Sequence, residues 1–246
     1  MKYLKYVSLV ILNWFFPKFS KNITNSYWMK TSKVHSDTSW DRYNFYYSNI
    51  KEIMELSGDE AILDAACGTG EITYLFYKDG FNVKGCDFSD FLINKAKTRF
   101  PDVEFYVDDL MTLTNTKEKY DKIFINNAIF YLHPKYLNKC FQALYATLKT
   151  NGSLYILDWP DFDKRKNVEG KRNSLLTIAL PVYQPTLGGF WYKRKWIKNA
   201  AVKSNFRSVG FLDSWTNYRS HAILKKILRM DKFYYRYFQK HYTRPI

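Results

Sequence analysis

Short apolar runs alternate with longer segments of mixed polarity along the middle of the chain. The apolar runs predict buried strands, over 61–65, 82–86, 103–107, 122–126 and 153–157. Three of the segments between them have apolar residues three and four positions apart, which predicts helices over 71–78, 90–100 and 134–148. Strands that alternate with helices indicate a parallel sheet covered by helices on both faces.

Turn-forming residues mark the ends of these elements. Gly80 follows the first of the three helices, and Ser89 stands where a cap for the second is expected. Pro101 prevents that second helix from continuing. Asn151 and Gly152 provide a turn before the fifth strand. These turn-forming and capping residues therefore support the same helices and strands as the apolar pattern.

The flanking sequence predicts additions to this core. Thr38 or Ser39 is placed to cap a helix that runs to Met54, and the range 196–209 predicts another helix, ended by Gly210. Two further apolar runs, 211–216 and 220–224, are expected to close the sheet as an antiparallel pair. We therefore predict an α/β fold with a Rossmann-like, seven-stranded, mostly parallel sheet, helices on both faces, an N-terminal helical cap and an insertion after strand five.

We divide the chain into four parts on this basis. They are an N-terminal helical and aromatic cap (1–45), a ligand-binding core (46–159), an insertion or lid (160–195), and a C-terminal part that completes the sheet and ends in a basic aromatic tail (196–246). The insertion breaks the alternation of strands and helices, and a long insertion near strand ends is typical of a binding loop or lid.

Composition and charge bear on the partners of the chain. The formal net charge is +15 and aromatic residues make up 19% of the sequence. This balance indicates a surface for anionic partners such as nucleic acid, phosphorylated sugar carriers or anionic lipid. Genome base composition explains it equally well, because the lysines are spread over the whole chain. Charge alone therefore leaves the partner open.

The N-terminal 21 residues combine basic residues with a short apolar run, 6–12. They resemble a signal peptide, but no small-residue cleavage site follows, and the run is too short to span a bilayer. A helix docked on the domain, an interfacial membrane helix and a signal all stay open. The three cysteines lack metal-ligand spacing, and their odd number argues against a disulfide framework. We expect a cytoplasmic protein, with peripheral contact to the inner membrane face through either terminus left open.

The stretch from Ile62 to Glu71 is the strongest functional signal in the chain. It predicts a strand end, a glycine turn at Gly68 and Gly70, and the start of a helix, an arrangement that lets backbone N–H groups approach a ligand. A dinucleotide-binding turn would have glycine or alanine where Thr73 stands. This difference and the acid at Asp64 argue against a pyrophosphate and favour a cationic ligand.

The motifs together resemble class I S-adenosylmethionine (SAM)-dependent methyltransferases. The segments that carry the resemblance are 62–70, 85–89, 103–110, 120–132 and 148–154. The resemblance covers about residues 45–158 and is specific to the superfamily, but not to a substrate. It implies SAM as the cofactor and the fold predicted above. No acidic cluster typical of a metal-dependent member is evident, so no metal site is predicted.

The resemblance implies roles for residues around the methionine part of the cofactor. Asp64 would interact with its amino group, and the backbone at Ala66, Gly68 and Gly70 would pass close to the methionine chain. Asn126, which follows the fourth strand, would line the side of the methyl donor.

The resemblance also implies roles around the nucleoside. Asp87 would hold the ribose hydroxyls, and Phe88 would lie beside the adenine. Asp109 would face the adenine amino group, with Leu110 against the ring. The position of Asp87 at the end of the second strand independently favours hydrogen bonds to a ribose.

Three residues are candidates for catalysis. A hydroxyl acceptor benefits from a general base, and His133, just after the fourth strand, is the first candidate. Asp158, after the fifth strand, is the second, and Tyr131 could position the acceptor. The structural alternative for His133 is that it starts the helix at Pro134.

The sequence narrows the acceptor only in part. Base methyltransferases of this superfamily commonly carry two prolines and an aromatic residue after strand four, whereas this chain has Asn127-Ala128-Ile129 there, which counts against nucleic acid. We favour a small-molecule acceptor, a sugar or surface-glycan precursor hydroxyl, phosphorylated or lipid-linked. Quinone or lipid methylation is the alternative, and a catalytically inactive SAM-binding protein is the alternative of another class.

Overall fold

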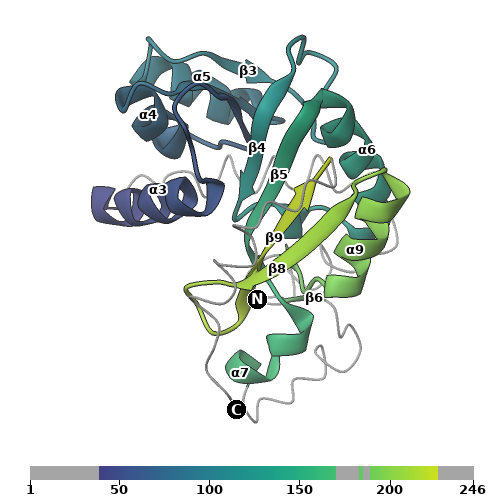
Figure 1. The fold of residues 1–246 in the computed structure, drawn as a ribbon. Helices are drawn as coiled ribbons and strands as arrows, with labels where there is room; N and C mark the ends of the chain where they lie inside the picture. Colours follow the sequence, from purple (N-terminus) through teal and green to yellow (C-terminus); the bar gives the residue numbers. More distant parts are fainter. Residues whose placement is uncertain (1–38, 170–182, 185–188, 227–246) are drawn as a thin grey trace.

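The computed structural model describes residues 39–169, 183–184 and 189–226, shown in colour in Figure 1. The structural statements below concern these residues. The expectations for the first 38 residues, for the middle of the insertion and for the basic aromatic tail lie outside them, including the interfacial helix and the membrane contacts of the termini.

A seven-stranded sheet forms the centre of the molecule, in the order β3-β2-β1-β4-β5-β9-β8 (Figure 1). Its strands are β1 (Ala61–Ala65), β2 (Asn82–Asp87), β3 (Phe105–Val107), β4 (Tyr120–Asn126), β5 (Leu148–Pro160), β8 (Ser208–Asp213) and β9 (Arg219–Lys225). Strands β1 to β5 pair in parallel, and β9 runs antiparallel to both neighbours. The predicted mostly parallel sheet, closed by an antiparallel pair, is confirmed.

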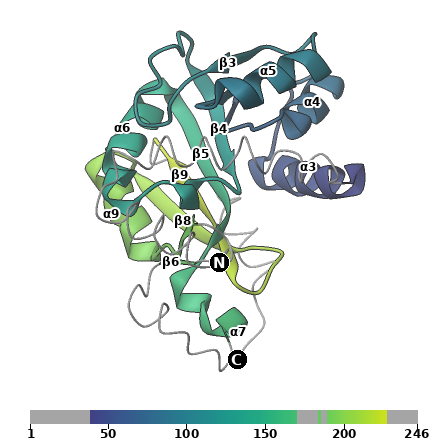
Figure 2. The ribbon, with the colours of Figure 1, turned by 180° about the vertical axis from the view of Figure 1, so that it is seen from behind.

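Helices cover both faces of the sheet (Figures 1 and 2). They are α3 (Trp40–Met54), α4 (Glu71–Lys78), α5 (Asp90–Arg99), α6 (Leu137–Thr147) and α9 (Arg194–Lys203). Alternate residues of one strand point to opposite faces. Ile62 therefore packs in the cluster with α3 and α4, whereas Leu63 packs in the cluster with α6 and α9. This two-sided burial explains why the central strands appear in the sequence as continuous apolar runs.

The insertion after β5 contributes to the core. Its described elements are η3 (Phe162–Lys164), α7 (Lys166–Glu169) and a two-stranded ribbon, β6 (Tyr183–Gln184) with β7 (Gly189–Phe190). Trp191 and Tyr192 at its end have no exposed surface. The Tyr192 hydroxyl donates to the carbonyl of Leu132, 2.6 Å away. This end of the insertion is therefore anchored beside the segment that follows β4.

Several predicted boundaries in the first half of the core are wrong by a few residues. The third strand begins at Phe105 rather than Val103, because the Val103 amide donates back to the Phe100 carbonyl in a turn. The predicted helix 134–148 begins as a 3₁₀ turn, η2 (Pro134–Tyr136), and α6 starts only at Leu137. Proline lacks an N–H but fits the first turn of a helix, which accounts for this start.

The boundaries in the last third differ more. The helix predicted over 196–209 spans Arg194–Lys203, because Asn205 adopts a left-handed conformation (φ 67°) that a helix cannot continue through. Gly210 therefore lies inside β8 rather than at a helix end. Strand β5 is also longer than expected and carries an irregularity between Ile156 and Trp159. That irregularity places Asp158 within the strand, not after it.

Three features of the described residues bear on the chemistry. The cysteines Cys67, Cys86 and Cys140 are free thiols. No group of three or more histidine, cysteine, aspartate or glutamate side chains is arranged to hold a metal ion in this part of the chain. None of its helices is both long enough and apolar enough to cross a bilayer.

Candidate functional site

The turn after β1 is built from residues in the left-handed region. Ala66, Gly68 and Gly70 have φ values of 70°, 59° and 83°. The amides of Ala66 and Cys67 both donate to the Cys86 carbonyl, at 2.8 and 2.9 Å, which fixes the turn to the end of β2. The helix α4 then starts directly after Gly70. The turn is therefore a rigid link between a strand end and a helix N-terminus.

The glycines of this region serve two different purposes. A Cβ atom at Gly70 or at Gly85 would lie 2.6 Å from the Phe105 ring. Glycine is therefore needed at these two positions so that the Phe105 ring can pack against the backbone. A Cβ atom at Gly68 would meet nothing within 4 Å. Gly68 thus presents its backbone to open space, where a ligand can approach closely.

Asp87 links the end of β2 to the turn. One of its carboxylate oxygens accepts the Gly68 amide at 3.1 Å and the other accepts the Ser89 amide at 3.0 Å. A carboxylate offers about four acceptor sites, so each oxygen keeps capacity for one more donor. Burial raises the pKa of Asp87 to about 6, although the backbone amides of Ser89, Gly68 and Phe88 lower it. The group is oriented to receive two hydroxyls.

Asp64 is a second buried acid, on β1. It accepts a hydrogen bond from Thr73 Oγ1 at 2.7 Å. Burial, with the charges of Asp87 and Glu71, raises the pKa of Asp64 to about 7, although the hydrogen bond from Thr73 lowers it. A cation bound beside it would lower this pKa again. Thr73 stands where a dinucleotide-binding turn would have glycine or alanine, and its hydroxyl orients the Asp64 carboxyl group.

Replacing Asp64 with asparagine is expected to remove one contribution to the pH dependence of stability. The pKa of Asp64 lies above its unfolded value of 3.8, so its stabilising contribution is complete below that pH and is lost as pH rises through about 7. The lowered pKa values of His133 and His221 act in the opposite direction, so urea unfolding of wild type and variant is compared at each pH from 5 to 8. The stability of wild type relative to the variant should fall as pH rises from 5 to about 7. Asp102→Asn, at an exposed position, is the matched control, and a slope equal to wild type in Asp64→Asn would contradict the assignment.

The loop after β3 separates the roles of two adjacent acids. Asp108 is buried and accepts the backbone amides of Asp109, Thr114, Asn115 and Thr116, so it organises the loop. Asp109 is half-buried and accepts the Met111 amide at 3.0 Å.

The two predicted neighbours of the adenine lie on the same strand ends. Leu110 follows Asp109 and packs against the main core cluster, whereas Phe88 follows Asp87 and is half-buried. The carboxyl ends of β2 and β3 are adjacent, because Asp87 pairs with Val107. Roles for Phe88, Asp109 and Leu110 at an adenine stay predictions.

Asn126 ends β4, at the same edge of the sheet. Its side-chain oxygen is buried and has no hydrogen-bond partner among the residues that the structure describes. Buried polar atoms are nearly always hydrogen-bonded in native proteins. A ligand that brings a hydrogen-bond donor or a positive charge to this edge would provide the partner that Asn126 Oδ1 lacks.

The second catalytic candidate, Asp158, lies in a buried network. One carboxylate oxygen accepts Ser214 Oγ at 2.8 Å and the other pairs with Arg219 at 3.1 Å. Arg219 Nη1 also donates to the Asp158 carbonyl and to Asn127 Oδ1. Asp158 and Asn127 both have left-handed backbones, with φ near 50°. Sequence reasoning missed the roles of both partners: Arg219 is part of no motif, and Asn127 is noted only as part of the segment after the fourth strand.

Burial and the ion pair have opposite effects on the pKa of Asp158. Burial raises the pKa of Asp158, and Arg219 lowers it. The carboxylate is engaged on both oxygens, so its role as a general base stays a prediction that the network does not favour. Its clear role is to balance the charge of Arg219.

The first catalytic candidate, His133, caps the helical turn η2. Its Nδ1 accepts the Lys135 amide at 3.2 Å. Burial, together with the charge of Lys135, lowers the pKa of His133 to about 4. The ring is therefore neutral at pH 7 and a weak base. The ring of Tyr131 contacts that of the preceding residue, Phe130, in a tilted arrangement with ring centroids 4.2 Å apart. The catalytic roles of His133 and Tyr131 stay predictions.

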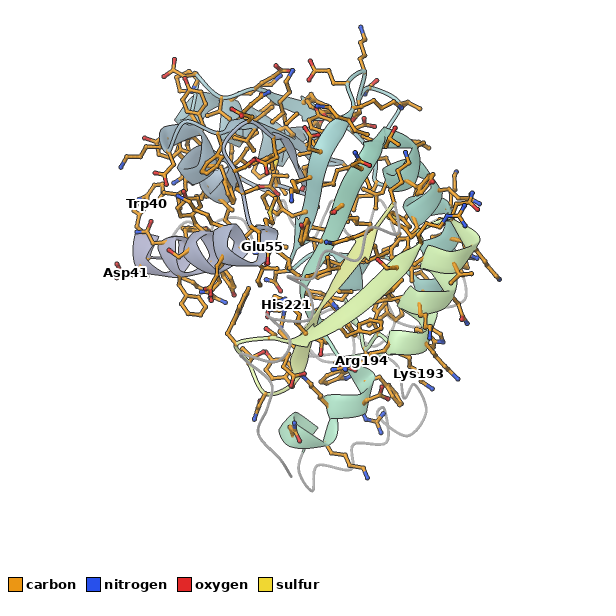
Figure 3. The ribbon with its side chains drawn as sticks, viewed as in Figure 1. Trp40, Asp41, Glu55, Lys193, Arg194 and His221 are labelled. Atoms are coloured by element: carbon orange, nitrogen blue, oxygen red, sulfur yellow. The ribbon has the colours of Figure 1, made fainter. Side chains whose placement is uncertain are left out.

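Aromatic residues cluster near β5 at the carboxyl edge of the sheet. Phe45 and Tyr46 of α3 both lie 5.6 Å from the ring of Trp215, in the turn between β8 and β9. Trp215 in turn lies 4.5 Å from the ring of His221 on β9, one of the residues labelled in Figure 3. The cap helix and the C-terminal strand pair thus meet beside Asp158, whose amide donates to His221 Nδ1.

Comparisons with known proteins agree with this arrangement. Residues 62–152 match the family model described as "Methyltransferase domain". The chain is 27% identical over 136 residues to phosphoethanolamine N-methyltransferase of Plasmodium falciparum, covering 51% of each protein. It is 28% identical over 147 residues to the ubiquinone/menaquinone biosynthesis C-methyltransferase UbiE of Campylobacter jejuni, covering 57% of this chain and 60% of that protein. The chain thus matches only about half the length of these relatives.

A solved structure supports the fold. Magnesium protoporphyrin IX methyltransferase from Synechocystis, solved with bound SAH, matches with a TM-score of 0.60 at 14% identity, over 85% of this chain and all of that one. The matched family segment runs from β1 to the start of β5 and contains the glycine turn, Asp87 and Asn126. Residues 62–152 therefore match a methyltransferase domain, and the described residues have the fold of SAM-dependent methyltransferases.

Proposed function

We propose that this chain transfers a methyl group from SAM to a small-molecule acceptor. The main support for the proposal is the arrangement of Asp87. Its buried carboxylate accepts the amides of Gly68 and Ser89, one on each oxygen, and each oxygen can accept one more hydrogen bond. Vicinal ribose hydroxyls match these two sites. Gly68 presents open backbone directly beside them.

The residues present also fit the rest of the cofactor. Asp64 and the unpaired oxygen of Asn126 would face the positively charged methionine end. Asp109 and Leu110, on the neighbouring strand end, would hold the adenine. When bound, SAM supplies a methyl group already activated on sulfur. The chain then has mainly to align the acceptor and exclude water.

The acceptor we favour is a hydroxyl of a sugar or surface-glycan precursor, carried on a phosphate or a lipid. The net charge of +15 supports an anionic carrier. Aromatic residues line the β5 side of the site, where Trp215 meets α3, and such rings suit either a sugar face or a quinone. Quinone or lipid methylation is therefore the second candidate. The relatives act on chemically different acceptors by their names, so these similarities do not choose between them.

Transfer of labelled methyl groups tests the proposal. The protein would be incubated with methyl-tritiated SAM and separate fractions of nucleotide sugars, lipid-linked sugars, quinones and RNA. Label is expected in a sugar fraction and should be absent with Asp87→Asn. Label in quinones would support the second candidate, and label in RNA would contradict both. SAM binding with no transfer to any fraction would favour an inactive binding protein.

A further inference from the structure

Two segments, one at the start and one at the end of the insertion, are unusually basic. Residues 162–166 read Phe-Asp-Lys-Arg-Lys and residues 193–198 read Lys-Arg-Lys-Trp-Ile-Lys. The first segment directly follows β5, and the second begins α9. Both therefore start from the carboxyl edge of the sheet, where the candidate site lies.

The basic start of α9 opposes the preference of a helix. Lys193 is the N-cap, Arg194 and Lys195 are the first two residues, and the first turn contains no acid. The N-terminus of a helix carries a partial positive charge, so cations there destabilise it. Lys195 and Lys198 add a like-charge pair three residues apart. A sequence that breaks such a local rule commonly does so for function.

The two segments form one surface. Phe162 holds them together, because the Arg165 guanidinium lies 4.9 Å and Lys193 Nζ 4.3 Å from the centre of its ring. Lys193 Nζ also lies 5.6 Å from the Trp196 ring. The Phe162 amide donates to the Tyr192 carbonyl, which joins the backbones. In Figure 3, Lys193 and Arg194 lie together at the end of α9 nearest α7.

Internal acids neutralise only part of this charge. Arg194 pairs with Asp161 and Asp213, and Lys164 pairs with Asp213. Lys166, Lys193, Lys195 and Lys198 make no ion pair with the residues that the structure describes. We call these four lysines, with Phe162 and Trp196, the cationic rim.

We propose that the cationic rim docks the protein on an anionic membrane surface. Lysines without an ion pair to a described acid match acidic headgroups, and half-buried aromatic rings among them suit the interface between water and lipid. Because both segments start from the carboxyl edge of the sheet, docking would bring this edge toward a lipid-anchored acceptor. The orientation of the acceptor rests on the proposed function, whereas membrane binding itself does not.

Vesicle sedimentation of the full chain tests the proposal. Vesicles of phosphatidylcholine with 30% phosphatidylglycerol would be compared with phosphatidylcholine alone, at 0.1 M salt. The rim variant is Lys193→Gln/Lys195→Gln/Lys198→Gln. The control variant is Lys78→Gln/Lys97→Gln/Lys117→Gln, which removes the same charge from exposed positions on α4, on α5 and in the loop before β4. Both variants should bind SAM like wild type by calorimetry, which separates this test from the donor site.

Wild type is expected to bind the anionic vesicles and not the neutral ones. Each lysine near an anionic surface contributes roughly a fivefold gain in binding, so the rim variant should partition about a hundredfold more weakly. The control should change by less than about threefold. Equal losses in both variants, no loss in the rim variant, or equal binding to neutral vesicles would overturn the proposal. So would a rim variant that loses binding to RNA but not to vesicles.

The rim variant also has an expected effect on stability. Removing cations from the first turn of α9 should leave its Tm unchanged or raise it. A clear fall in Tm would show that these lysines stabilise the fold and would contradict a role in docking.

Discussion

Replacement of Arg219 by methionine is expected to lower the free energy of unfolding by about 3–5 kcal/mol, the typical effect of breaking a buried ion pair. Arg219 and Asp158 are both almost fully buried, and their charges lie 3.1 Å apart. Without the guanidinium, the Asp158 carboxylate stays buried with only Ser214 as a side-chain donor. Asn127 Oδ1 also loses its donor. Urea unfolding at pH 7.5 measures the loss.

Two further variants identify the cause of that loss. Arg219→Met/Asp158→Asn removes both charges and should recover much of the stability, because a neutral amide is less costly to bury than an unpaired carboxylate. Arg207→Met, at an exposed position, should change stability by less than about 0.5 kcal/mol. A loss below about 1 kcal/mol in Arg219→Met would contradict the network. So would a double variant less stable than the single one.

Replacement of Asp87 by asparagine is expected to weaken SAM binding about a hundredfold. The carboxylate is placed to accept two hydroxyls while it holds the amides of Gly68 and Ser89. Asparagine keeps the shape but loses one acceptor oxygen and the charge, and hydrogen bonds to charged groups contribute about 1.5–3 kcal/mol each. Calorimetric titration at pH 7.5 measures the change, and circular dichroism checks the fold.

The pH dependence of binding provides an internal check on Asp87. Its pKa of about 6 in the free protein means that wild type should lose SAM affinity as pH falls from 7.5 to 5, because the protonated acid accepts hydroxyls less well. The asparagine variant should lack this part of the pH dependence. Asp90→Asn, three residues away and exposed, is the control and should bind like wild type. A change below threefold in Asp87→Asn would remove Asp87 from the donor site.

The sequence predicts the elements around the donor site because local signals define them. Strand β1 and helix α4 have the bounds that the apolar pattern and Gly80 predict, and Ser89 caps α5 by accepting the Leu92 amide. Each of these features depends on residues a few positions apart. Parallel pairing then brings the carboxyl ends of the strands to one edge, so Asp64, Asp87 and Asn126 follow from topology.

The opposite side of the site depends on contacts that no local pattern encodes. Arg219 reaches Asn127 and Asp158, which lie far away in the sequence, and it is part of no motif. The left-handed conformation of Asp158 arises at an irregularity of β5, so the acid that looks free after a strand is paired inside it. Similarly, only the structure shows that the buried Asp108, and not the half-buried Asp109, organises the loop after β3. Long-range packing decided these positions, not propensity.

Calorimetric titration of the full chain with SAM tests whether the glycine turn, Asp64 and Asp87 form a site for a cationic methyl donor. We expect one SAM to bind per chain at pH 7.5, S-adenosylhomocysteine to compete for the same site, and NAD not to bind. Folded protein that shows no heat with SAM, or that binds NAD instead, would contradict the claim.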